Sequence, residues 1–171
     1  MTLEPFRFCP KCGGDLPAPG EDGGTRCKNC GRTWYQNPAP TVGVALVRDR
    51  RALVTVRAGE PEKGRIDVPG GFLAPEEDAL EGLRREVREE LGVEIEVAED
   101  DCISLATHRY GDDGISVLAI GFVGRIVHGE PQPADDVADA RWVTADELDE
   151  LDFAWPHDRE LVRRALERSR R

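Results

Sequence analysis

Three glutamates near the middle of the chain have a spacing that suits metal binding. Glu86, Glu89 and Glu90 stand at positions i, i+3 and i+4, which an α-helix places on one face. Like charges so close together repel one another, and bound cations remove that repulsion. Carboxylate oxygens suit Mg²⁺, which proteins usually hold with one or two carboxylates plus the phosphates of a substrate. The spacing therefore predicts a Mg²⁺ site, with Mn²⁺ as the alternative ion, that acts on a phosphate compound.

The segment around these glutamates is expected to form a helix over residues 75–91. Pro75 suits the first helical position, and Gly92 suits the end of a helix. An apolar stripe beside the glutamates predicts packing against a core, and it consists of Leu80, Leu83, Val87 and Leu91. Gly70 and Gly71, just before this helix, leave space for the backbone to approach cations or phosphate. Taken alone, the helix also fits a solvated face of ordinary i, i+4 ion pairs.

Four of the five cysteines form two Cys-x-x-Cys pairs, namely Cys9, Cys12, Cys27 and Cys30. A glycine follows each pair and permits the tight turn that wraps a backbone around sulfur. This pattern favours a structural Zn²⁺ with four cysteine ligands, closed to substrate. Two disulfides or two redox motifs are the alternatives. The fifth cysteine, Cys102, stands alone in an apolar run and is expected to be a small buried residue.

The overall composition narrows the classes of partner. The chain has 171 residues and a net charge of −11, which argues against nucleic acid and against an anionic membrane as partners. The longest apolar run, residues 117–123, is far shorter than the roughly 20 residues of a membrane helix. The first residues show no apolar stretch of the kind found in signal peptides. We therefore expect a soluble cytoplasmic protein.

Two prolines mark an expected domain boundary. Pro38 and Pro40 form a stiff extended joint, so we expect a zinc ribbon over residues 1–37 and a second domain over residues 38–171. In the second domain, β-branched and apolar runs predict a hairpin, strands at 41–48 and 52–57 around a polar turn. Further strands are expected at residues 93–98, 103–108, 115–127 and 138–143. A mostly sheeted core with flanking helices follows.

The glycine, the helix and its glutamates belong to one longer pattern. Gly71, five residues, Glu77, seven residues, and then the run from Arg85 to Val93 match every fixed position of the Nudix box G-x5-E-x7-R-E-U-x-E-E-x-G-U, where U is a bulky aliphatic residue. The chain therefore resembles the Nudix hydrolases. The resemblance implies an α/β fold, an α/β/α sandwich around a mixed sheet. It also implies Mg²⁺-dependent hydrolysis of a nucleoside diphosphate linked to another group.

The resemblance also implies roles for particular residues. Glu86, Glu89 and Glu90 correspond to the metal ligands of the family, and Gly71 would contribute at the loop. Arg85 would orient these glutamates, and Glu77 would support the loop or a further metal. Family members often supply another acid from a later loop, and Asp135 and Asp136 lie in that neighbourhood. Asp136 is the favoured candidate, although the family commonly has glutamate there and a simple polar turn is the alternative.

The implied substrate class is broader than one compound. A four-cysteine ribbon before such a domain is similar to the arrangement in NADH pyrophosphatases and in enzymes linked to ADP-ribose and FAD hydrolysis. The Ser-Gln-Pro-Trp motif of the NADH enzymes is missing, and His108 stands where many ADP-ribose enzymes have proline. Tyr110 resembles a tyrosine of diadenosine polyphosphate hydrolases. ADP-ribose, FAD or NADH is therefore favoured, while hydrolysis of diadenosine polyphosphates or nucleoside triphosphates is an alternative.

A non-catalytic module that senses or binds a nucleotide is the alternative from another class. In either class a nucleobase would stack on an aromatic side chain, and the candidates are Phe72, Tyr110, Trp142, Phe153 and Trp155. Packing in the core is the other interpretation for each of them. Many members of the family are dimers, so a homodimer is compatible with the resemblance.

Overall fold

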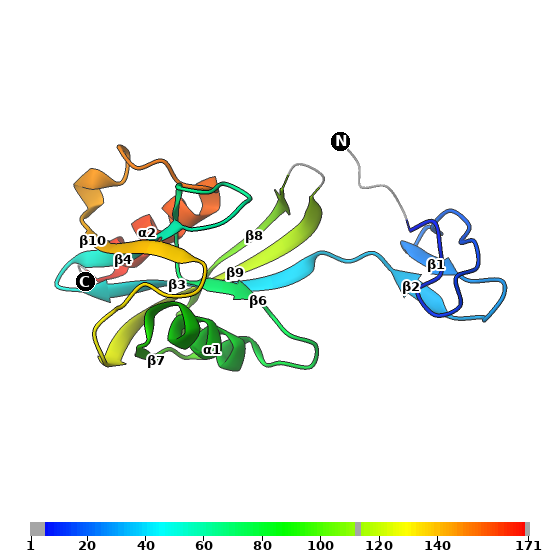
Figure 1. Cartoon of the computed structure of the whole chain (residues 1–171), viewed down its shortest axis with the longest axis horizontal. Helices are drawn as coiled ribbons and strands as arrows, with labels where there is room; N and C mark the ends of the chain where they lie inside the picture. The colour runs from blue at the N-terminus through cyan, green and yellow to red at the C-terminus, as the bar shows by residue number, and fades with distance from the viewer. Residues whose placement is uncertain (1–5, 112–113, 170–171) are drawn as a thin grey trace. The chain divides into compact units, whose positions relative to one another are not determined.

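The computed structural model describes residues 6–111 and 114–169, and the chain forms two compact units, Met1–Pro38 and Ala39–Arg171 (Figure 1). The first unit contains a small antiparallel sheet of β1 (Gly24–Arg26) and β2 (Thr33–Tyr35). In both cysteine pairs the following glycine has a positive φ, 70° at Gly13 and 73° at Gly31. The N–H groups of these glycines donate to the carbonyls of Cys9 and Cys27, so each pair closes a tight turn.

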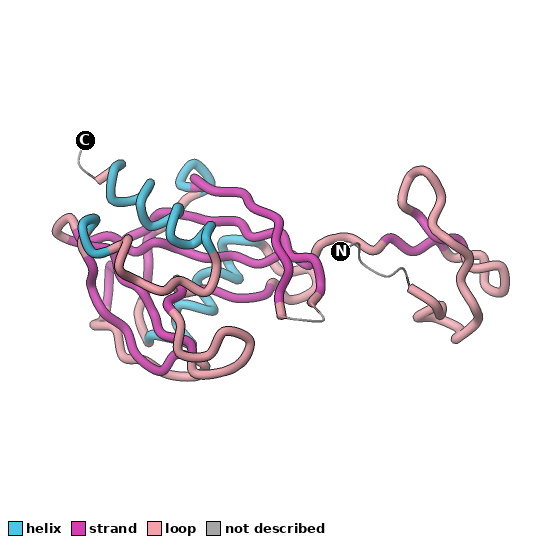
Figure 2. The backbone as a smooth tube through the Cα atoms, turned by 90° about the horizontal axis from the view of Figure 1, so that it is seen from above, coloured by secondary structure: helices cyan, strands magenta, loops and turns pink. Residues whose placement is uncertain are grey.

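The second unit is built on an eight-stranded mixed sheet. Its central strands, β3 (Ala39–Arg48) and β9 (Ile115–His128), run parallel, and the other pairings among its described strands are antiparallel. The remaining strands are β4 (Arg51–Arg57), β5 (Ile66–Asp67), β6 (Gly70–Phe72), β7 (Glu94–Glu96), β8 (Cys102–Tyr110) and β10 (Val137–Val143). Figure 2 traces these strands in magenta and the helices in cyan.

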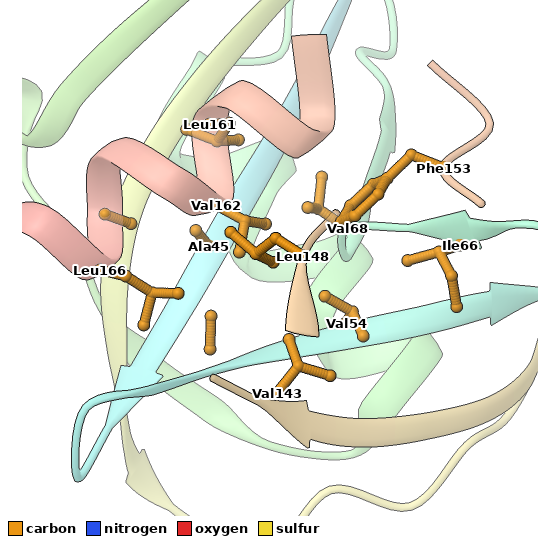
Figure 3. Packing of buried hydrophobic residues seen from close by; sticks show 12 residues of the cluster. Ala45, Val54, Ile66, Val68, Val143, Leu148, Phe153, Leu161, Val162 and Leu166 are labelled. Atoms are coloured by element: carbon orange, nitrogen blue, oxygen red, sulfur yellow. The ribbon is translucent and has the colours of Figure 1, made fainter. Parts of the chain in front are cut away.

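Two helices cover opposite faces of this sheet. Helix α1 (Ala79–Leu91) packs on the cluster that contains Val42, Val44 and Leu46 of β3, whereas α2 (Pro156–Arg168) packs on the cluster that contains Ala45. The two clusters take alternate residues of β3 because successive side chains of a strand point to opposite faces. Figure 3 shows the α2 side of this core. Each fully buried leucine or valine contributes about 1.5–3 kcal/mol. The predicted α/β/α sandwich around a mixed sheet is confirmed.

Most of the predicted strands are present with ends shifted by a few residues. The polar turn of the predicted hairpin contains Asp49 and Arg50, both with positive φ. Short 3-10 turns, η1 (Glu99–Asp101) and η2 (Ala145–Glu147), connect strands and helices. The expectation of a buried Cys102 is wrong, because this residue is exposed at the first position of β8, beside a register shift in the pairing with β9. Within the described ranges, no helix is both long enough and apolar enough to cross a bilayer.

Candidate active site

The helix that carries the glutamates begins later than predicted. Helix α1 starts at Ala79, and Asp78 is its N-cap, with the Asp78 carboxylate accepting from the N–H of Leu80 at 2.9 Å. Pro75 lies in a turn before the helix, and Glu76 has a φ of 67°, which no helix continues. The predicted start at residue 75 is therefore wrong. The predicted end is confirmed, because Gly92 caps the helix with a φ of 66°.

Glu90 points into the protein beneath the glycine loop. Its residue surface is only 4% exposed, and the backbone N–H of Gly70 donates to its carboxylate at 2.9 Å. Burial raises the pKa of Glu90 to about 9, and the charges of Asp136, Glu86 and Asp67 act in the same direction. A divalent cation at this position would offset the cost of burying the negative charge.

Arg85 links the other acidic residues of the motif. Its guanidinium donates to both carboxylate oxygens of Glu77, at 2.7 and 2.9 Å, and to Glu86 and Glu89 at 2.8 and 3.0 Å. The hydrogen bonds from Arg85 hold the pKa of Glu77 at about 2. Glu77 also accepts from the N–H of Ala74 at 2.9 Å. Arg85 and Glu77 therefore tie the acidic residues of α1 to the loop before the helix.

Glu86 lies directly under Gly71. A Cβ atom added to this glycine would approach the Glu86 carboxyl group to 2.6–2.8 Å. Burial raises the pKa of Glu86, and the charges of Glu89 and Asp136 add to this effect. Asp136 belongs to a loop that is tied to the end of α1, where the N–H of Ala134 donates to the Glu90 carbonyl at 2.8 Å. The structure thus brings Asp136 near the glutamates.

The three glutamates share a helix face, but their oxygens do not meet at one point. Among the described residues, only the four cysteines form a group of three or more ligand side chains whose ligand atoms all lie within 4.8 Å of one another. The acidic set nevertheless fits a divalent cation. Burial raises the pKa values of Glu86 and Glu90, and Gly71 leaves space beside Glu86 that any side chain would fill.

A cavity of about 290 Å³ opens beside these acids. Gly70, Gly71, Glu86, Asp135 and Asp136 line its acidic end. Three of the aromatic candidates also line the cavity, namely Phe72, Tyr110 and Trp155. The other two lie elsewhere: Trp142 packs under the Arg48 guanidinium, 4.4 Å from its ring centre, and Phe153 is buried in the α2 cluster. The cavity is therefore lined by acidic groups and by the stacked rings of Tyr110 and Trp155, whose surroundings form its aromatic end.

The aromatic end contains polar residues to which the sequence alone gave no role. Arg57, Asp67, His108, His157 and Asp158 all line the cavity. Burial lowers the pKa of both histidines, that of His157 to about 4, so they are uncharged at neutral pH. Burial next to Asp67 raises the pKa of Asp158 well above its usual range. Apart from the adjacent His157 and Asp158, these residues come from separate segments, and no local spacing in the sequence links them.

The four cysteines of the first unit converge on one point. The Cys9–Cys30 and Cys12–Cys27 sulfur separations are both 3.6 Å. Four sulfurs about 2.3 Å from a tetrahedral Zn²⁺ lie about 3.8 Å apart, whereas a disulfide bond measures roughly 2 Å. Burial opposes ionisation of Cys9, but N–H groups of Cys12, Lys11 and Trp34 outweigh it and lower its pKa to about 6. The cluster fits a zinc ribbon, and the thiols are free rather than bridged.

Comparison with known proteins agrees with this geometry. Residues 37–165 match the NUDIX domain, so the chain belongs to the Nudix hydrolase family. A protein named NAD-capped RNA hydrolase NudC, from Chromobacterium violaceum, is 28% identical over 169 residues, which cover 96% of this chain and 60% of that protein. The chain thus spans less than two thirds of that relative.

Two further proteins are similar to this chain. A putative 8-oxo-dGTP diphosphatase 2 of Mycobacterium tuberculosis is 39% identical over 124 residues, which cover 69% of this chain and 81% of that protein. The crystal structure of a NUDIX hydrolase from Nitrosomonas europaea aligns with a TM-score of 0.75 at 24% identity, over 96% of this chain and 93% of that one. The second similarity supports the fold.

Proposed function

We propose that the chain is a divalent-cation-dependent pyrophosphohydrolase that cleaves a nucleoside diphosphate linked to another group, with ADP-ribose, FAD or NADH as the favoured substrates. One observation carries this proposal. A single cavity is lined both by the acids Glu86 and Asp136 and by the aromatic rings of Phe72, Tyr110 and Trp155. A molecule with a diphosphate near a nucleobase has the matching order of chemical groups.

The residues of the Nudix box would have distinct roles in this reaction. Glu86, Glu89, Glu90 and the Gly71 backbone would hold Mg²⁺ or Mn²⁺. When bound, the cation neutralises the diphosphate and lowers the pKa of an attacking water. Arg85 keeps Glu86 and Glu89 oriented, and Glu77 keeps Arg85 in place. With ADP-ribose, water adds to one phosphorus, the bridging P–O bond breaks, and AMP, ribose 5-phosphate and a proton are released. Asp136 or a glutamate of the box accepts the proton.

A second candidate is hydrolysis of a nucleoside triphosphate. The Mycobacterium tuberculosis relative, which carries the name of a nucleotide diphosphatase, favours this candidate, because its match covers 81% of that protein. The same acids would serve, but water would cleave the bond between the α- and β-phosphates and give pyrophosphate and a nucleoside monophosphate.

A panel of nucleotides with mass detection of the products separates these candidates. The purified chain is incubated with Mg²⁺ and ADP-ribose, NADH, FAD, diadenosine tetraphosphate or 8-oxo-dGTP. The proposal predicts AMP from ADP-ribose or from a dinucleotide. Pyrophosphate from 8-oxo-dGTP, with no product from the other compounds, would favour the second candidate. Tight binding of a nucleotide without turnover would support the sensing module and contradict both.

The effect of Mg²⁺ on thermal stability is expected to depend on pH. In the metal-free protein Glu90 keeps its proton up to a pKa of about 9, whereas the unfolded chain loses it near the ordinary glutamate value of 4.5. The metal-free protein therefore loses stability as pH rises through this window. Because Mg²⁺ must displace the proton, the rise in Tm on adding Mg²⁺ should be larger at about pH 8 than at about pH 6. A rise in Tm that is equal at both values would contradict this role of Glu90.

We also propose that residues 1–37 form a separate zinc ribbon and that residues 38–171 form the hydrolase domain. Cys9, Cys12, Cys27 and Cys30 would hold one Zn²⁺ in a closed tetrahedral site that takes no part in the chemistry.

Elemental analysis should find one zinc per chain, since structural zinc sites of this type bind tightly. Cys27→Ser is expected to release it, because Cys27 is completely buried beside the other thiols. Hydrolysis by the second domain should continue in this variant. Absence of zinc from the native chain purified without chelators would refute the ribbon.

A further inference from the structure

Arg57, the last residue of β4, makes three polar contacts at the aromatic end of the cavity. Its guanidinium is 2.7 Å from the Asp67 carboxylate, donates to the Pro61 carbonyl at 2.8 Å and donates to the Tyr110 hydroxyl at 3.1 Å. The Arg57 and Asp67 side chains are only 12% and 14% exposed. The guanidinium is planar and its donors point in fixed directions, so these three contacts hold Arg57 and its partners in a definite orientation.

The same guanidinium also lies against two of the three aromatic rings of the cavity. Its central carbon is 4.9 Å from the ring centre of Trp155 and 5.8 Å from that of Tyr110. These two rings are stacked, with centres 5.5 Å apart and planes at 20°, and Phe72 meets Tyr110 edge-on at 5.2 Å. The rings come from the end of β8, the N-cap of α2 and β6. Arg57 thus connects segments that are distant in the sequence.

The charge of Arg57 is already balanced by Asp67. Among the described residues that line the cavity, Arg57 is the only lysine or arginine. The nearby histidines are uncharged, because burial lowers the pKa of each. This end of the cavity therefore offers flat rings and neutral polar groups, which suit a nucleobase better than a phosphate.

We propose that Arg57 is a positioning residue that holds Tyr110 and Trp155 as the wall on which the nucleobase of the substrate stacks, and that it thereby sets affinity for the base. This inference rests on the proposed function, because it assigns the aromatic end of the same cavity. It places no part of the bond cleavage on Arg57. Its loss should therefore weaken substrate binding far more than it slows turnover.

Two variants and two ligands test the proposal. Arg57→Lys keeps the charge beside Asp67 but loses the planar fork, and Tyr110→Phe removes only the hydroxyl that Arg57 contacts. With ADP-ribose, Arg57→Lys should raise KM about 10-fold and change kcat less than about 2-fold. Calorimetry should show AMP binding weakened by a similar factor, and about 3-fold in Tyr110→Phe. Binding of ribose 5-phosphate, which has no base, should be unchanged in both.

The control is Arg65→Lys, because Arg65 lies in the loop that follows β4 but pairs with Glu62 and Asp152 at the protein surface. It should leave KM, kcat and the binding of both ligands unchanged.

A lower kcat with unchanged KM in Arg57→Lys, or equal losses for AMP and ribose 5-phosphate, would overturn the proposal. Failure of the native chain to hydrolyse any nucleotide would refute the proposed function instead. The calorimetric comparison of the two ligands would still decide the role of Arg57. Tyr110→Phe leaves the Arg57–Asp67 pair intact, so it remains informative if Arg57→Lys folds poorly.

Discussion

Replacing Glu90 with glutamine is expected to lower kcat by about 10²–10³-fold without reducing the thermal stability of the metal-free protein. Glutamine keeps the oxygen that accepts the Gly70 N–H at 2.9 Å and has almost the same shape. Because burial raises the pKa of Glu90 to about 9, the metal-free protein already holds a neutral side chain there at pH 7. What the variant loses is the ability to become a carboxylate when a cation binds. Steady-state kinetics with saturating Mg²⁺ and a thermal melt in EDTA measure the two effects.

The matched control for this variant is Glu81→Gln on the same helix. Glu81 is exposed in the first turn of α1, so its replacement should change neither measurement appreciably. The proposed metal site would be wrong if Glu90→Gln and Glu89→Gln both kept the native kcat. If Glu90→Gln lowered the Tm in EDTA as well as kcat, Glu90 would have a structural role instead.

Gly71→Ala is expected to lower activity by about 10²-fold while the fold persists. The added methyl group would lie 2.6–2.8 Å from the Glu86 carboxyl group, which is closer than real Cβ contacts allow. The nearest atoms belong to the end of a flexible side chain, so Glu86 would move away and the backbone would stay in place. That movement would also disturb the 2.8 Å pair between Glu86 and Arg85. Kinetics with Mg²⁺ and circular dichroism test the two halves of this expectation.

Gly59→Ala serves as the control, because a Cβ atom at Gly59 meets nothing within 4 Å. Native activity in Gly71→Ala would mean that the position of Glu86 does not matter for turnover. If Gly71→Ala, but not Gly59→Ala, lost the circular dichroism signal of the folded protein, the added methyl group would have displaced the backbone rather than the Glu86 side chain.

The features that the sequence predicted are those set by local spacing. The turn periodicity of a helix places Glu86, Glu89 and Glu90 on one face and buries Leu83 and Val87 on another, whatever the rest of the fold does. The two Cys-x-x-Cys turns are equally local, since each closes through a hydrogen bond to its own first cysteine. Alternation of apolar residues likewise indicated the main strands.

The features that the sequence could not predict depend on contacts between distant segments. Arg57 meets Asp67 because β4 pairs with β5, and it meets Tyr110 and Trp155 because β8 and α2 end at the same cavity. Trp155 lines the cavity whereas Phe153 packs in the core, and this difference also depends on the tertiary fold. The error at the start of α1 has a local cause, because the positive φ of Glu76 is a conformation that a non-glycine residue rarely adopts.

The most direct test of the metal site is anomalous diffraction from crystals of the chain with Mn²⁺ and a non-hydrolysable ADP-ribose analogue. We expect a Mn²⁺ peak bounded by Glu86, Glu89 and Glu90, with the diphosphate on its other side, as the proposed metal site requires. An analogue bound in the cavity with no metal peak beside any of these carboxylates would contradict it.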